Sequence, residues 1–305
     1  NTAEAFGEFV PAEEDETSAD VVFAPHALPP GLALDAATGK VCWHDLIDGD
    51  DLRARKQLVA IGTAVSPDGT RVVAGAGRYQ TVFDVATGKR IWHGNGCYEG
   101  EPSTAAPAYG KDSIVTAQNW RPAVCADAGT GKVRWQFDKA RSPGAAPVIR
   151  GEMVLIADGN TLFELDLGTG KVLRSKSYPF GFSVPGDFTL TERLYLKGVD
   201  GKGLVAIDRR TLEVVWQAPV GKGLIGQFAY AGRGRVVLST TPAIVDERTV
   251  CAACADGTIG FWNLADGRKL REIRTGAPYL TGAVVSDGRV YATDMTGVLR
   301  AFEIG

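Results

Sequence analysis

The sequence predicts an all-β protein, a seven-bladed β-propeller of four-stranded antiparallel blades that forms one domain over residues 1–305. Two observations predict this fold. A short motif is repeated along the chain, first as ALDAATGKVCW at residues 33–43 and again as VFDVATGKRIW at 82–92. Around each copy, short apolar segments alternate with Gly-containing turns, a pattern typical of antiparallel strands and hairpins.

The repeats keep a fixed internal spacing. Each copy opens on an acidic residue or Asn, and a Trp or Arg follows eight positions later. The opening residues are Asp35, Asp84, Asp127, Asp166, Asp208 and Asn263, and the residues eight positions later are Trp43, Trp92, Trp135, Arg174, Trp216 and Arg271. A seventh, partial copy ends the chain at Glu303, and the mean spacing of about 45 residues is typical of propeller blades.

Each copy reads as the outer hairpin of one blade. In the first turn, the carboxylate of Asp35 can accept hydrogen bonds from backbone amides two and three residues later, and the Gly of the TGK sequence supplies the positive φ that closes the turn. Upstream units such as residues 145–166 and 281–303 read as three short strands. With the strand after TGK, each unit has four strands. The recurring Trp on the fourth strand is expected to pack between adjacent blades.

Two segments depart from the repeat. Residues 221–239 are predicted to be an insertion, because the distance from Asp208 to Asn263 exceeds the usual spacing. At the other end, residues around Asn1–Phe6 are expected to supply the fourth strand that the last blade lacks, which would close the ring and remove open sheet edges. Asn1 itself suggests a processed chain or a domain of a larger protein.

The motif closely resembles the repeat of the PQQ-like propellers, the quinoprotein alcohol dehydrogenase-like superfamily, from about residue 20 to the end of the chain. It departs from that pattern at Arg174 and Arg271, where Trp is expected, and at Leu212 and Glu213, where Gly and Lys are expected. Two blades also carry WD40-like features. The superfamily includes a non-catalytic branch similar to an outer-membrane barrel assembly lipoprotein.

The resemblance raises the alternative of a PQQ- and calcium-dependent quinoprotein dehydrogenase. Those enzymes often carry a disulfide between adjacent cysteines, and this chain has no Cys-Cys pair. Most of its Asp residues lie in turn motifs, so the sequence predicts no catalytic residue, no cofactor and no metal site. Cys251 and Cys254 form a CxxC, but residues three apart on a strand point to opposite faces, which favours a structural role.

The sequence instead favours binding through loops at one end of the propeller, because loops on a rigid scaffold commonly carry function. Aromatic residues and Arg are enriched in binding hot spots. The candidates in these loops are Tyr79, Tyr98, Trp120, Arg121, Tyr178, Phe182 and Tyr279, with Phe180 beside them. The alternative is that several of these side chains simply pack over the channel mouth or on neighbouring loops.

Composition narrows the partner class. The net charge of −3 and the absence of a basic block argue against nucleic acid. No apolar run approaches the ~20 residues that a membrane span needs. We therefore expect a monomeric scaffold or sensor that recognises a protein, peptide or glycan. The resemblance favours an extracytoplasmic location, whereas a cytoplasmic WD40-type scaffold with five free thiols is a further alternative.

Overall fold

The computed structural model of the chain describes residues 21–24, 30–35, 38, 40–46, 60–76, 79–94, 106–117, 122–140, 145–182, 187–199, 202–220, 241–254, 256–279, 282–294 and 296–304. Every regular element in these ranges is a β-strand, and every strand pairing is antiparallel, so the all-β prediction is confirmed. Within the same ranges no helix is long and apolar enough to cross a membrane. The predicted closing segment Asn1–Phe6 and the predicted insertion at 221–239 lie outside the described residues.

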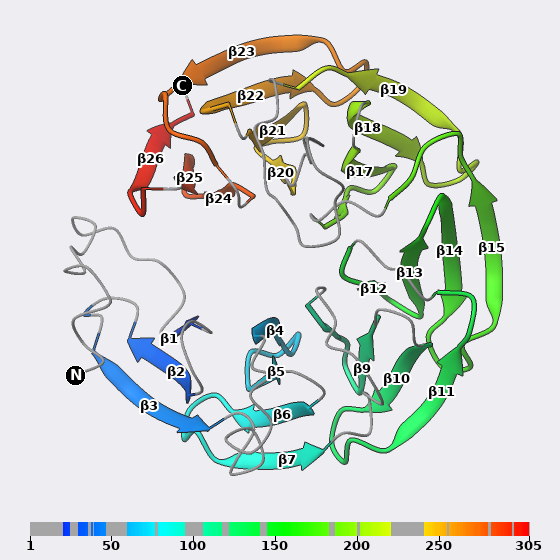
Figure 1. Cartoon of the computed structure of the whole chain (residues 1–305), viewed down its shortest axis with the longest axis vertical. Helices are drawn as coiled ribbons and strands as arrows, with labels where there is room; N and C mark the ends of the chain where they lie inside the picture. The colour runs from blue at the N-terminus through cyan, green and yellow to red at the C-terminus, as the bar shows by residue number, and fades with distance from the viewer. Residues whose placement is uncertain are drawn as a thin grey trace, which may run out of the picture. The chain divides into compact units, whose positions relative to one another are not determined.

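The first of two compact units comprises residues 1–116 and 124–136. Its three sheets are meanders, in which strands that follow one another in the chain are neighbours in the sheet. The strands are β1 (Val21–Ala24), β2 (Pro30–Asp35) and β3 (Val41–Leu46); β4 (Ala60–Val65), β5 (Arg71–Ala76), β6 (Tyr79–Asp84) and β7 (Arg90–Gly94); β8 (Ala108–Tyr109), β9 (Ser113–Thr116), β10 (Ala123–Asp127) and β11 (Val133–Phe137). The sheets β4–β7 and β8–β11 lie side by side (Figure 1), and a buried apolar cluster joins them.

The second unit comprises residues 117–123 and 137–305 and repeats the same design. Its four sheets follow one another in chain order (Figure 1). The strands are β12 (Val148–Arg150), β13 (Met153–Asp158), β14 (Thr161–Asp166) and β15 (Val172–Ser177); β16 (Thr189–Leu190), β17 (Leu194–Val199), β18 (Gly203–Asp208) and β19 (Val214–Ala218); β20 (Ala243–Ile244), β21 (Thr249–Ala253), β22 (Thr258–Asn263) and β23 (Lys269–Arg274); β24 (Val284–Ser286), β25 (Arg289–Thr293) and β26 (Leu299–Glu303). The described residues thus hold seven sheets, one for each predicted repeat.

Burial explains why the middle strands read as continuous apolar runs. In β13, Val154, Leu155, Ile156 and Ala157 are all buried, although successive side chains of a strand point to opposite faces. Both faces of the sheet are therefore covered, as expected when one sheet packs against the next. The outer strand β15 is exposed at most of its positions, so the core lies between sheets and along their inner strands.

A register shift recurs beside the motif acid. In five sheets, the pairing between the strand that ends at the motif residue and the outer strand slips just before that residue, for example between Glu164 and Leu165. A bulge of this kind bends the strand and increases its twist locally. In these five sheets the outer strand therefore follows the turn after the same local irregularity.

Candidate functional site

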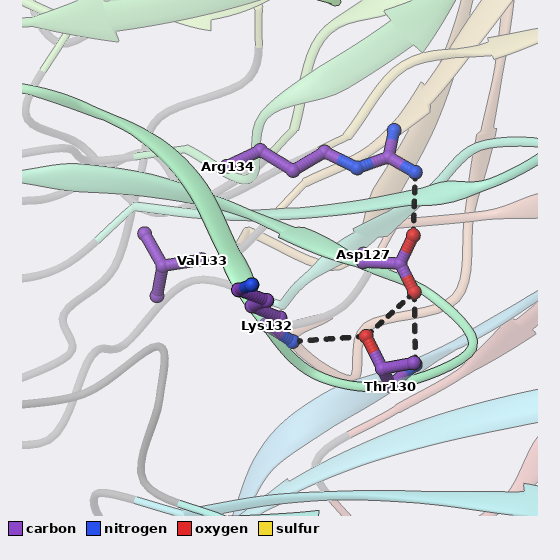
Figure 2. Close-up of a pocket in the computed structure, with 5 residues that line it drawn as sticks. All are labelled: Asp127, Thr130, Lys132, Val133 and Arg134. Atoms are coloured by element: carbon purple, nitrogen blue, oxygen red, sulfur yellow. Dashed lines mark hydrogen bonds and ion pairs between the residues drawn. The ribbon is translucent and has the colours of Figure 1, made fainter.

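The acidic turn is clearest in the β10–β11 hairpin, where Asp127, Thr130, Lys132, Val133 and Arg134 line a shallow pocket of about 310 Å³ (Figure 2). Thr130 donates to Asp127 Oδ1 from its backbone N–H at 2.9 Å and from its hydroxyl at 2.8 Å, and Arg134 Nη2 donates to Oδ2 at 2.6 Å. These hydrogen bonds lower the pKa of Asp127, and the bond from Arg134 has the largest effect. Its carboxylate is thus fully engaged in holding the hairpin.

The other motif residues make the same turn. Each accepts a hydrogen bond from a backbone amide two or three residues later, as the sequence predicts, and the bonds to Asp35, Asp84, Asp166, Asp208 and Asn263 are 2.7–2.9 Å long. Turn formation therefore accounts for this recurring acid in all the repeats in which the turn is described.

Three motif Trp residues link their own sheet to the sheet that follows it in the chain. The indole N–H donates to the carbonyl of the residue directly after the one that opens the next motif copy: Trp43 to Val85 at 2.7 Å, Trp92 to Ala128 at 2.9 Å, and Trp216 to Leu264 at 2.9 Å. Trp135 is likewise buried, at 8% exposure. Each of these three indoles thus bonds to the turn of the following sheet, beside which the sequence predicts that it packs.

The indole also explains the motif Gly. A Cβ placed on Gly88 would lie 2.6 Å from the ring of Trp43, and one on Gly267 would lie 2.5 Å from the ring of Trp216. Both glycines have φ near +70°, a conformation that costs other residues energy. Gly is thus required twice at this position, by the turn and by the ring that covers it.

The two departures from the motif at Arg174 and Leu212 belong to one interface. Arg174 replaces the Trp, and its guanidinium donates to the carbonyls of Arg209 and Arg210 at 2.6 and 2.5 Å, so it reaches the same part of the next turn as the indole does elsewhere. Leu212 replaces the Gly that would lie beneath an indole, keeps the left-handed φ of 60°, and is buried at 4% exposure. Without a ring above it, the position accommodates a side chain.

Arg174 is held by a buried acid. Its Nε and Nη2 donate to the two carboxylate oxygens of Glu164 at 2.7 Å each, and Tyr195 donates its hydroxyl to Glu164 at 2.7 Å. Burial, followed by the bond to Glu164, raises the pKa of Tyr195 to about 12. This paired geometry is the kind that compensates a buried carboxylate.

Three of the seven predicted binding residues lie in the core of the second unit. Tyr178 and Phe182 are 4% and 0% exposed, and their rings meet at 5.3 Å in an edge-to-face contact. Phe180 stacks on Tyr178, whose hydroxyl donates to the carbonyl of Leu212 at 2.9 Å. Burial is the main cause of the raised pKa of Tyr178.

Tyr279, the third, is 2% exposed and packs with Phe261 and Val290. The prediction that Tyr178, Phe182 and Tyr279 present their rings to a partner is therefore corrected: these rings fill the space between sheets. Among the remaining candidates, Tyr98, Trp120 and Arg121 lie outside the described residues, and the backbone of Tyr79 begins β6.

The Cys and His side chains that the sequence analysis weighed are either buried in the core or exposed on outer strands, where they are described. Cys251 and Cys254 are buried, and burial raises the pKa of Cys251 to about 12, far from the reactive range. His44 and His93 are exposed on outer strands. Among the described residues, no three His, Cys, Asp or Glu side chains form a group that could hold a metal.

Comparison with known proteins places these repeats among bacterial relatives. Residues 80–304 match the PQQ_2 family model, described as outer membrane protein assembly factor BamB. The outer membrane protein assembly factor BamB of Burkholderia pseudomallei is 26% identical over 81% of this chain, and that of Bordetella pertussis is 23% identical over 73%. The matched regions cover 62% and 56% of those proteins, so the chain spans about six tenths of their length.

Solved structures show the same fold. BamB from Moraxella catarrhalis superposes with a TM-score of 0.62 at 16% identity, covering 96% of this chain and 99% of that one. The computationally designed protein Ika8 superposes with a TM-score of 0.59 at 14% identity, covering 95% of each chain. With the antiparallel meander sheets, these superpositions confirm the β-propeller prediction.

Proposed function

We propose, because this chain belongs to the PQQ_2 family of outer membrane protein assembly factor BamB, that it is a non-catalytic propeller that binds a protein partner during outer membrane protein assembly. The observation that carries this proposal is the family match, which extends from residue 80 to residue 304. It implies an extracytoplasmic location, in agreement with the expectation from the repeat.

The use of the motif side chains supports a binding role. The motif carboxylates are occupied by turn hydrogen bonds, and the indoles of Trp43, Trp92 and Trp216 are committed to bonds between sheets. The repeat chemistry thus builds a scaffold, and recognition is left to the segments between strands, as is usual in such folds. Of the predicted binding residues, Tyr79, Tyr98, Trp120 and Arg121 remain our candidates for contact with the partner.

Site-specific photo-crosslinking in the source bacterium tests this proposal. A photoreactive amino acid replaces Trp120 in one variant and Leu173 in another; Leu173 is 55% exposed on the outer strand β15 and serves as the matched control. We expect Trp120, and not Leu173, to crosslink to a protein of outer membrane assembly that mass spectrometry identifies. Crosslinks that form equally at Leu173, or only to unrelated proteins, would contradict the proposal.

A thermal-shift titration with PQQ and calcium, alone and together, tests the alternative of a quinoprotein dehydrogenase. A ligand that binds only the folded state raises the melting temperature. We expect no saturable shift. A metal-dependent upward shift of several degrees would overturn the non-catalytic assignment.

A further inference from the structure

The sheet β24–β26 has three described strands, whereas the other three sheets of the second unit have four. Its third strand, β26, pairs only with β25 among the described residues (Figure 1). A strand at the edge of a sheet presents a row of unpaired backbone N–H and C=O groups, which can pair with a further strand. The open side of β26 is therefore a place where an extended chain can add to the sheet.

Strand β26 otherwise repeats the third strands of the complete sheets. Glu303 occupies the place of the motif acid, and the next residue, Ile304, donates its backbone N–H to the carbonyl of Gly288 at 2.9 Å. In a complete sheet, Leu167 makes the corresponding bond to the carbonyl of Glu152 at 2.8 Å. The complete sheets can thus serve as templates for what fits beside β26.

An apolar side chain on this edge is open to solvent. Leu299 precedes Glu303 by four residues and is 65% exposed, the highest value among the exposed large apolar side chains of the described residues. The residues at the same place in the other three sheets of this unit are all 0% exposed, namely Leu162, Leu204 and Ile259. Leu299 is thus the counterpart of three core residues, yet a partner can reach it.

The complete sheets also define what an added strand should carry. In five sheets, the third-strand residue two before the one that opens the motif lies opposite the Trp or Arg of the fourth strand. These pairs are Ala33 and Trp43, Val82 and Trp92, Glu164 and Arg174, Ala206 and Trp216, and Phe261 and Arg271. Ala301 holds that position in β26 and is exposed. Residues 1–6, which the sequence suggests for this place, contain neither Trp nor Arg.

We propose that β26 binds an extended segment of the protein partner, which adds to the sheet as an antiparallel fourth strand with a Trp or Arg opposite Ala301. Strand addition of this kind takes its affinity from main-chain hydrogen bonds and its specificity from alternate side chains. Leu299 supplies the exposed apolar contact for the added strand. The inference rests on the proposed protein-binding function and names the surface and the conformation of the partner segment.

Fluorescence anisotropy with a labelled peptide tests the inference. The probe is TLEVVWQAP, the sequence of residues 211–219, which contains the fourth strand β19. We expect it to bind the wild-type chain saturably. Two further versions are N-methylated at alternate amides, so that each has lost the N–H donors of one edge. Because an added strand pairs through one edge only, one version should bind about tenfold more weakly and the other like the unmodified peptide.

Two matched variants of the protein locate the binding surface. Leu299→Lys places a charge on the open edge strand, and Leu173→Lys places one on the fourth strand of a complete sheet, where the side chain is 55% exposed. We expect Leu299→Lys to bind the peptide about tenfold more weakly, because a charge on an edge strand opposes strand addition. Leu173→Lys should bind like the wild type. Both substitutions alter exposed side chains, so both variants should keep the wild-type melting temperature.

Three results would overturn the inference: no saturable binding to the wild type, equal binding to Leu299→Lys, or equal binding of the two N-methylated peptides. Binding that appears only after Phe6→Asp would instead assign the edge to the N-terminal segment of the same chain. The crosslink from position 120 separates these failures from failure of the proposed function. It forms in the wild type and in Leu299→Lys if only the inference is wrong, and it is absent from the wild type if the function is wrong.

Discussion

The contact between Trp216 and Gly267 leads to a quantitative prediction. Replacing Gly267 by Ala places a Cβ at φ +71° and 2.5 Å from the indole, whereas carbon atoms in contact are normally about 3.5–4.0 Å apart. The backbone strain alone should cost about 1 kcal/mol. The indole must also move, which weakens its 2.9 Å bond to Leu264 and its packing, at a further cost of about 2 kcal/mol. We expect a total loss of about 3 kcal/mol.

Gly288 provides the matched control for the backbone term. It has the same φ of +71°, lies in the same unit, and a Cβ placed there meets no atom within 4 Å. Gly288→Ala should therefore cost only the strain of about 1 kcal/mol. Urea denaturation followed by circular dichroism measures the free energy of unfolding of both variants, and their difference isolates the contact with the ring.

A double-mutant cycle completes the test. In a Trp216→Ala background the ring is gone, so Gly267→Ala should cost no more than Gly288→Ala does in the wild type. Trp216→Ala by itself should cost about 3–5 kcal/mol, as large buried aromatic deletions do. If Gly267→Ala and Gly288→Ala reduce stability equally in the wild type, the idea that the indole requires this Gly is refuted.

Three further predictions concern charged side chains of the second unit. Arg174→Met leaves the carboxylate of Glu164 buried without its ion pair, and because Arg174 is partly exposed the free energy of unfolding should fall by about 2 kcal/mol. Adding Glu164→Gln should recover more than half of that loss, as measured by urea denaturation. Burial lowers the pKa of Lys197 to about 8. Between about pH 8 and 10.5 the unfolded state therefore binds more protons than the folded state, and the free energy of unfolding should rise with pH. The variant Lys197→Met should flatten that rise, and an unchanged slope would contradict this prediction. The hydrogen bonds from Thr169 lower the pKa of Asp166, so the stability they confer should fall as pH drops below about 4, and melting curves of Asp166→Asn should lose that part of the pH dependence.

The repeat could be predicted from the sequence because its chemistry is local. The carboxylate of Asp127 bonds to amides two and three residues away, and the offset of eight residues to Trp135 follows from one hairpin. Interactions of this range leave a fixed spacing in the sequence. The fold class, the acidic turns and the role of the motif Trp residues were therefore all accessible without coordinates.

The coupling of Arg174 to Leu212 was harder to predict. Each is visible in the sequence as a departure from the motif, but they occur in different copies, 38 positions apart. Only the structure shows that the outer strand of one repeat covers the turn of the next. Once that rule is known, a motif Trp in one copy predicts Gly at the turn of the next copy. Where the Trp is absent, that turn position can hold a residue with a side chain.

The binding residues show where sequence reasoning fails. Tyr178, Phe180 and Phe182 lie in a segment rich in Pro and Gly, which predicts a loop, and aromatic side chains in a loop can equally well bind a partner or pack inward. The structure shows inward packing, with Phe182 contacting Phe188 at 5.6 Å. The density of apolar residues in YPFGF was the available signal.

The linkage of each Trp to the following repeat also bears on the biosynthesis of the chain. The carbonyl that receives the indole N–H of Trp43 belongs to a residue 42 positions later, and the corresponding separation for Trp216 is 48. During translation, the outer strand of one sheet emerges well before the turn against which it closes. A chain that ends before the next hairpin therefore lacks the carbonyl that accepts this hydrogen bond, so each of the described linkages requires two successive repeats.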